Sequence, residues 1–275
     1  MMALIQSEWE RQWLRKTTWI PFLLIPLLVV VSARYATGRN VVLPVTDPEY
    51  ATAFNFPVLA LVEMLIVVMN VLLLMWCVLS ITQEWRNGQL RMILLRPVSF
   101  AHIIGAKWVV IMGTMALFLF AYGFTGALVG GVMFSVPEEP RLFYYENPVP
   151  VAGAIGYVCG YYVLAFLTLM AMGGIWMAIA LHAKTLTGAM GAGVGFLLAS
   201  FAYPEVLARF SIGLDPPINP VWDFLSLTQV QHMGIALLLG EPNSFNGIII
   251  GVLTGVILFT AVGNGIAAAR REHWD

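Results

Sequence analysis

Long blocks of apolar residues, separated by short polar segments, make up most of this chain. A helix needs about 20 mostly apolar residues to cross the hydrocarbon core of a bilayer. Blocks of that size predict six transmembrane helices, at roughly 17–35, 57–81, 108–134, 151–181, 186–204 and 246–268. No connection between them is long enough for a soluble catalytic domain. The pattern therefore predicts an all-α membrane protein with one polytopic domain over residues 1–275.

The segment before the first block, residues 1–16, has the pattern of an amphipathic helix. At helical spacing, one face carries an apolar stripe of Met2, Ile5, Trp9 and Trp13. The polar residues away from that stripe are Glu8, Arg11, Gln12 and Arg15. A helix with aromatic residues on one face and charges on the other lies flat at the membrane interface. The pattern fits a simple surface anchor, and it also fits an interfacial elbow helix that packs beside the other helices.

The segment between the fifth and sixth blocks, residues 203–245, is unusual. Residues 221–239 are apolar enough to enter the membrane, but prolines bound them on both sides. A seventh crossing there would move the C-terminal tail to the opposite side and weaken the charge asymmetry of the connections. We therefore expect outer-side helices, partly re-entrant, between spans 5 and 6.

The composition supports a membrane location. Hydrophobic residues make up 60% of the chain and charged residues 11%, and the mean hydropathy is +0.83. Soluble domains carry about 25% charged residues. A chain this apolar cannot cover its surface with polar groups, so membrane lipids must surround it.

The net charge of −1 conceals an asymmetry between the two sides of the predicted membrane. One side holds the N-terminal segment, residues 82–107, residues 182–185 and the C-terminal tail. Ten of the fourteen basic residues lie there: Arg11, Arg15, Lys16, Arg86, Arg91, Arg96, Lys107, Lys184, Arg270 and Arg271. The positive-inside rule places this side in the cytoplasm. We expect a multi-pass protein of a bacterial or archaeal cytoplasmic (inner) membrane, with both termini cytoplasmic.

The connection at 82–107 contains a short amphipathic helix that Pro97 ends. Its apolar face consists of Leu90, Ile93 and Leu94, and Arg91 and Arg96 lie outside that face. Glu84 lies just ahead of Gly88, where its carboxylate could cap the helix or pair with a nearby residue. Such a helix would present a small apolar face, framed by arginines, to a cytoplasmic partner. A positive-inside anchor with no partner fits the same pattern.

Glu63 is the acidic residue inside the second predicted span. It lies about six residues, roughly 9 Å, from the outer end of that span. Glu63, Asn70, Cys77 and Glu84 follow one another at sevens, which would place them on one helix face. An ionisable group in a span is costly and marks a functional candidate, although a structural hydrogen bond or snorkelling to the outer surface explains Glu63 as well. We expect no basic residue within the spans, so the expected partners of Glu63 within the chain are polar: Asn70 or hydroxyls on a neighbouring helix.

Together with two tyrosines of the fourth span, these polar residues are candidates for a translocation pathway. Glu63, Asn70, Tyr157 and Tyr161 could line an amphipathic path for a lipid, an apolar peptide or a drug. Core packing accounts for the tyrosines equally well.

Glycines recur at four-residue spacing in the later blocks. The sets are Gly126/Gly130, Gly156/Gly160, Gly191/Gly195 and Gly247/Gly251/Gly255. This spacing lets helix backbones approach closely in a membrane, so we predict tight helix packing at these positions.

No residue set in the sequence supports a reaction. Gly105-Ala106-Lys107-Trp108 lacks the upstream glycine and the Ser/Thr of a phosphate-binding loop, and the four histidines show no metal-ligand spacing. We expect no catalytic residue, no metal and no cofactor of the chain's own, and no nucleic-acid partner.

The charged connection resembles a known family. Glu84-x-x-x-Gly88, then Leu94-Leu95-Arg96-Pro97-Val98-Ser99, then Ile103-Ile104-Gly105-Ala106-Lys107 is similar to the first cytoplasmic loop of type-2 ATP-binding-cassette (ABC) permeases, with Gln89 in place of the usual Thr. The resemblance extends to the amphipathic N-terminal helix, the six spans, the outer helices before the last span and the Arg-Arg-Glu end of the chain.

The resemblance implies a mechanism. In that family the loop holds a coupling helix that docks on a separate ABC ATPase. The resemblance therefore implies a coupling role for Glu84, Gly88, Leu90, Arg91, Ile93, Leu94, Arg96 and Pro97. Two permease subunits, identical or homologous, work with two ATPase subunits that carry the ATP and Mg²⁺.

The leading interpretation is therefore the transmembrane subunit of an ATP-driven exporter. One alternative is an ion-gradient-driven secondary transporter that uses Glu63. Another is a subunit that passes a conformational change to an extracytoplasmic partner without transport.

Overall fold

The structure is a computed structural model that describes residues 1–87, 99–212, 214, 219–242 and 244–271 of the chain. Every regular element in those ranges is a helix. In chain order they are α1 (Met2–Trp13), α2 (Lys16–Asn40), α3 (Phe56–Met64), η1 (Leu65–Met69), α4 (Asn70–Val78), η2 (Leu79–Gln83), α5 (Glu84–Arg86), α7 (Phe100–Met133), α8 (Val151–His182), α9 (Leu186–Ser211), η3 (Pro220–Leu225), α10 (Leu227–Gln229), η4 (Val230–Gly234), α11 (Ile235–Leu239) and α12 (Asn246–Arg271).

Six of these helical segments are long and apolar enough to cross a membrane, which confirms the six predicted blocks. They are Lys16–Asn40, Phe56–Gln83, Phe100–Met133, Val151–His182, Leu186–Ser211 and Asn246–Arg270. A block of apolar residues is a local property of the sequence, so it survives whatever the tertiary packing does.

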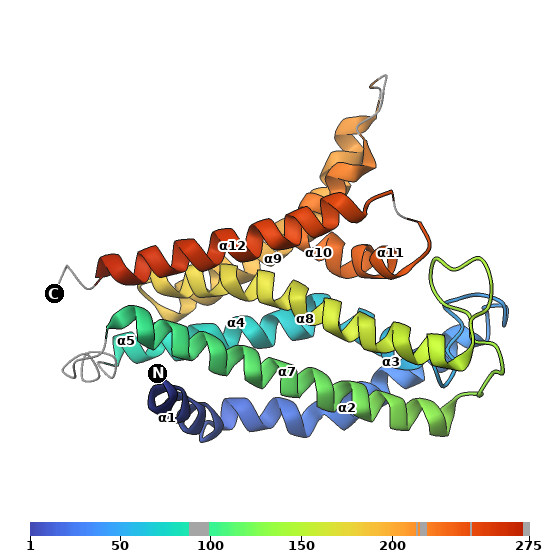
Figure 1. Cartoon of the computed structure of the whole chain (residues 1–275), viewed down its shortest axis with the longest axis horizontal. Helices are drawn as coiled ribbons and strands as arrows, with labels where there is room; N and C mark the ends of the chain where they lie inside the picture. The colour runs from blue at the N-terminus through green and yellow to red at the C-terminus, as the bar shows by residue number, and fades with distance from the viewer. Residues whose placement is uncertain (88–98, 213, 215–218, 243, 272–275) are drawn as a thin grey trace.

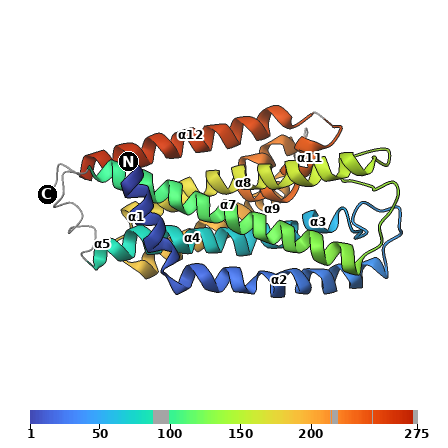
Figure 2. The same ribbon diagram turned by 60° about the horizontal axis from the view of Figure 1, so that its bottom comes forward.

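The long helices lie side by side in one bundle (Figures 1 and 2). α7 packs against α1, α2 and α3, while α8 packs against α4 and α12. Large side chains fill the centre of the bundle, and Trp76, Phe118, Tyr122 and Trp176 are fully buried there. α1 and the last turn of α12 lie at one end, called the α1 end below, and the α2–α3 and α7–α8 connections lie at the other, called the loop end.

Three helices are longer than the sequence blocks suggested. α2 continues to Asn40 and α7 begins at Phe100, so polar residues near the span ends are helical. The expectation that no basic residue lies within the spans is wrong, because Arg34 and Arg39 belong to α2 and Lys107 belongs to α7. α9 also continues through Pro204 to Ser211, and its last turns project from the bundle in Figure 1.

Two π-helical turns, η1 and η2, interrupt the second span. A seven-residue spacing keeps residues on one face only in an uninterrupted α-helix, and a π turn adds a residue that rotates the next part of the helix about its axis. The prediction of one face for Glu63, Asn70, Cys77 and Glu84 is therefore wrong. Glu63 is exposed on one side of η1, whereas Asn70 on the other side is completely buried.

The glycine spacing marks close packing in α7 and at Gly160 of α8, where an added Cβ would lie 3.0 Å from the Leu239 side chain, but not at the other positions. A Cβ added at Gly130 of α7 would lie 3.1 Å from the carbonyl oxygen of Ala53, and one at Gly126 would lie 3.4 Å from Pro57. Within the described residues, a Cβ would meet nothing within 4 Å at Gly156, Gly191, Gly195, Gly247, Gly251 and Gly255. For those six the packing prediction is wrong within a single chain. Five of them belong to α9 and α12, which lie at the edge of the bundle and are mostly exposed, and Gly156 lies on an exposed part of α8.

Candidate functional site

The most buried residues of α1 are polar. Glu8 and Gln12 face the bundle, and Gln12 Oε1 accepts a hydrogen bond of 3.4 Å from the hydroxyl of Ser80 in η2. On the aromatic side, the ring of Trp9 lies 3.3 Å from the position of a Cβ built on Gly113 of α7. α1 is therefore attached to α7 and to the second span through both of its faces.

Five charged side chains meet where α1, α5 and α7 come together, and we call them the ion cluster: Glu8, Arg11, Arg15, Glu84 and Lys107. Lys107 Nζ lies 2.7 Å from a carboxylate oxygen of Glu8 and 2.7 Å from one of Glu84. Arg11 Nη1 lies 3.2 Å from each of the same two carboxylates, and Arg15 pairs with Glu84. The cluster thus joins two carboxylates to three cations across three helices.

Burial makes the cluster sensitive to any unpaired charge. The side chain of Lys107 is 1% exposed, that of Glu84 2% and that of Glu8 5%. Moving ions out of water costs several kcal/mol each unless close counter-charges and hydrogen bonds compensate. Here two carboxylates contact the Lys107 ammonium, and three cations contact Glu84. Because Glu8 and Arg11 belong to α1, the compensation of these buried charges depends on the position of α1.

The ion cluster lies at both ends of the segment for which the family resemblance implies a coupling role. Glu84 precedes residues 88–98 and Lys107 follows them by two turns of α7. The other coupling residues lie outside the described residues: Gly88, Leu90, Arg91, Ile93, Leu94, Arg96 and Pro97. The sequence singled out Glu84 and Lys107 by their motif, but it missed their partners. Arg11 lies 73 residues from Glu84, and no local pattern encodes such a contact.

At the loop end, a cavity of about 560 Å³ lies between α2, the second span, α8 and η4, and we call it the loop-end cavity. Its charged lining residues are Arg39, Glu49 and Glu63. Arg39 and Glu49 form an ion pair, and the Arg39 guanidinium lies 5.9 Å from the centre of the Tyr35 ring.

The four pathway candidates separate into two groups. Glu63 and Tyr161 both line the loop-end cavity. Tyr157 is buried beside Tyr161, with ring centres 6.2 Å apart, and is not among the lining residues. Asn70 lies elsewhere, in the hydrogen-bonded core of the bundle.

Asn70 holds the segment between α9 and α12 against the bundle. Its Nδ2 donates to Gln231 Oε1 of η4 at 2.7 Å, and Gln231 Nε2 donates to the Thr168 hydroxyl of α8 at 3.3 Å. All three side chains are buried. Asn70 Nδ2 therefore joins the second span to η4, a structural role, although Asn70 Oδ1 has no hydrogen-bond partner among the described residues.

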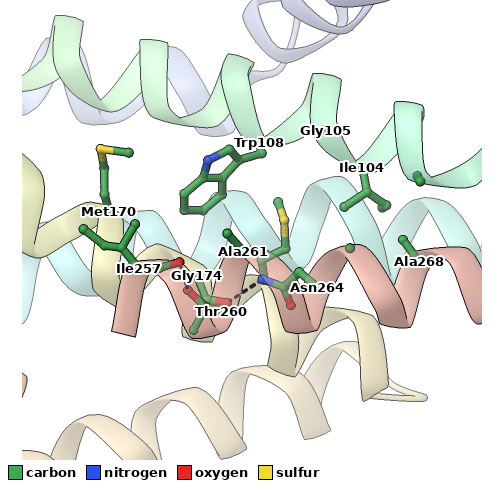
Figure 3. A pocket seen from close by; sticks show the side chains of 13 residues that line it. Ile104, Gly105, Trp108, Met170, Gly174, Ile257, Thr260, Ala261, Asn264 and Ala268 are labelled. Atoms are coloured by element: carbon green, nitrogen blue, oxygen red, sulfur yellow. Dashed lines mark hydrogen bonds between the residues drawn. The ribbon is translucent and has the colours of Figure 1, made fainter. Parts of the chain in front are cut away.

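A second cavity, of about 200 Å³, lies among α7, α8 and α12 and is nearly apolar (Figure 3). Figure 3 shows Trp108 and Met170 on its walls and the amide of Asn264 turned toward α8. Asn264 Nδ2 donates to the Gly174 carbonyl oxygen at 2.9 Å, and the Thr260 hydroxyl donates to Val256 of its own helix at 2.7 Å. Because these polar groups are occupied and no ionisable residue lines the cavity, it carries no chemistry of its own.

The family comparison agrees with the architecture. Residues 4–182 match the family described as ABC-2 family transporter protein, a stretch that runs from α1 to the end of α8 and includes the whole ion cluster. No curated protein matches the chain. Since the matched stretch covers more than half of the 275 residues and six apolar helices accompany it, the chain is a multi-pass membrane protein that belongs to the ABC-2 transporter family.

Proposed function

We propose that this chain is the transmembrane subunit of an ATP-driven ABC exporter. Two permease subunits, identical or homologous, form the translocation pathway and work with two separate ABC ATPase subunits. The chain itself is not an enzyme, and ATP and Mg²⁺ bind to the partner. The α1 end faces the cytoplasm, because the excess of positive charge lies at that end.

The ion cluster is the observation that supports this proposal most strongly. A coupling helix transmits force only if its ends are fixed to the spans. Glu84 and Lys107 contact each other at 2.7 Å across the base of the 88–98 connection, and both are tied to α1. A push on the connection would therefore move α1, the second span and α7 as a unit.

The energy for that movement comes from the ATPase dimer, which binds the two coupling helices more tightly in one conformation of the permease than in the other. ATP-driven closure of the ATPase dimer favours one position of the two coupling helices, and a ligand shifts an equilibrium only through such differential affinity. The segment from η3 to α11 re-enters the bundle from the outer side and meets the second span at Asn70. Movement of the second span would thus reach the loop end.

Purification from native membranes tests the proposal. We expect a tagged chain to retain an ATPase with Walker motifs, and we expect Leu94→Asp to lose it, because a charge cannot enter an apolar groove without a cost of several kcal/mol. Val42→Asp is the matched control, since Val42 lies 85% exposed at the loop end. Retention of the ATPase by Leu94→Asp as in the wild type would contradict the coupling assignment.

The same preparation separates the alternatives. Absence of any ATPase from the wild-type preparation would favour a secondary transporter. An ATPase that is present but never stimulated by a transported compound would favour a subunit that acts on an outer partner. The family membership already argues against the first of these.

A further inference from the structure

The loop-end cavity has features that coupling to an ATPase does not require. Five aromatic side chains line it: Tyr35, Phe143, Tyr144, Tyr161 and Phe201. Aliphatic side chains of α3 and η1 complete the wall. A largely apolar cavity with a few convergent polar groups is the usual form of a small-molecule site, and about 560 Å³ lies within the usual range of about 300–1,000 Å³.

The charges in the wall leave one carboxylate uncompensated. Arg39 and Glu49 neutralise each other in their ion pair. Within the described residues Glu63 has no cation close enough to form an ion pair, and His232 also lines the cavity. The cavity therefore presents the Glu63 carboxylate among aromatic rings, without an ion-pair partner in the described part of the chain.

One aromatic residue of the wall also has an unpaired polar group. Tyr161 is fully buried, lines the cavity, and its hydroxyl has no hydrogen-bond partner among the described residues. Buried hydroxyls are normally paired, because an unpaired one loses its hydration without compensation. Because this hydroxyl is itself buried, we assign Tyr161 only the role of an aromatic wall residue.

The backbone holds two of the aromatic residues over the cavity. Tyr144 has a φ of 60°, which is uncommon for a residue with a side chain. Its carbonyl oxygen accepts a hydrogen bond of 3.0 Å from the Glu241 amide, and Tyr145 Oη donates to Leu239 at 2.9 Å. Gly240 permits this approach, since a Cβ there would lie 2.5 Å from Tyr144 Cβ. The strained conformation thus fixes Tyr144 and its neighbour Phe143 in the cavity wall.

We propose that the loop-end cavity binds a lipophilic organic cation, with its charge against the Glu63 carboxylate and its apolar groups against the aromatic rings. Cations are attracted to the faces of aromatic rings, and a carboxylate adds a direct charge interaction. An anion of the same shape would meet Glu63 with a like charge. That this cation is the exported compound rests on the proposed function, whereas its binding does not.

Equilibrium dialysis of the full chain in phosphatidylcholine nanodiscs tests the binding. Tetraphenylphosphonium and tetraphenylborate are the probes, because they have the same shape and opposite charge, and empty nanodiscs give the background. We expect saturable binding of the phosphonium, about one per chain, and no saturable binding of the borate. Glu63→Gln should weaken phosphonium binding at least about tenfold, and Tyr161→Leu should weaken it several-fold.

Two further variants keep the test independent of folding. Glu63→Asp retains the charge and should keep most of the affinity, whereas Glu205→Gln removes an exposed carboxylate of α9 outside the cavity and should leave binding unchanged. Equal binding of the two probes, no saturable binding, or wild-type affinity in Glu63→Gln would each overturn the proposal. None of these results depends on the ATPase, so they leave the Leu94→Asp test of the exporter function separate.

Discussion

Replacing Lys107 with Met tests whether the ion cluster fixes α1 to the bundle. The substitution keeps the unbranched side chain up to its fourth atom and removes the ammonium that contacts both Glu8 and Glu84 at 2.7 Å. At an effective dielectric constant of about 20, each contact corresponds to roughly 6 kcal/mol of Coulomb attraction before desolvation is subtracted. Removing one partner from a buried ion pair costs about 3–5 kcal/mol in practice.

We expect Lys107→Met to lie near the lower end of that range, with a loss of about 3 kcal/mol of unfolding free energy. Arg11 still faces both carboxylates at 3.2 Å, and Arg15 still pairs with Glu84. The assay is equilibrium unfolding in mixed micelles of a mild detergent and dodecyl sulfate. Hydrogen exchange of the α1 backbone amides should also become faster, because Glu8 then has one cation fewer to hold it against the bundle.

Two comparisons decide whether the cluster is responsible. Glu205→Gln removes a carboxylate from the exposed Arg209–Glu205 pair, whose side chains are 76% and 70% exposed, and should cost under about 1 kcal/mol. Glu8→Gln combined with Lys107→Met should cost less than the sum of the two single changes, since contacting residues are coupled. The role assigned to the cluster would be refuted if Lys107→Met were as stable as Glu205→Gln and if the double variant lost the exact sum of the two single losses of unfolding free energy.

Three further predictions concern packing and topology. Gly174→Ala should lower the free energy of unfolding by about 1–3 kcal/mol in the same assay, because its Cβ would lie 2.1 Å from a threonine oxygen of α12. Gly156→Ala is the control and should be neutral, because its Cβ would meet nothing within 4 Å. Gly240→Ala should displace Tyr144 and weaken tetraphenylphosphonium binding several-fold in the dialysis assay, and unchanged affinity would show that the connection does not shape the cavity. A cysteine at Ser99 should react with a membrane-impermeant reagent from the cytoplasm and one in the α7–α8 connection from outside, whereas labelling of both from one side would contradict the six-span topology.

The sequence alone determined the number of spans and their approximate positions. A run of about 20 apolar residues has few alternatives to a membrane helix, because backbone polar groups in lipid must bond within their own segment. The motif from Glu84 to Lys107 likewise identified the family that the comparison shows, since it consists of neighbouring residues. Both are local properties.

The tertiary structure decided where the polar residues of those spans lie. The π turn η1 separates Glu63 from Asn70, although their spacing of seven predicted a common face. The partners of Lys107 and Glu84 come from α1, where the sequence showed only an amphipathic pattern. The loop-end cavity combines Arg39 of α2 with Tyr161 of α8, which are far apart along the chain. Contacts between distant segments depend on how whole helices pack and on π turns, each of which adds one residue to a helical turn. Neither produces a periodic pattern in the sequence.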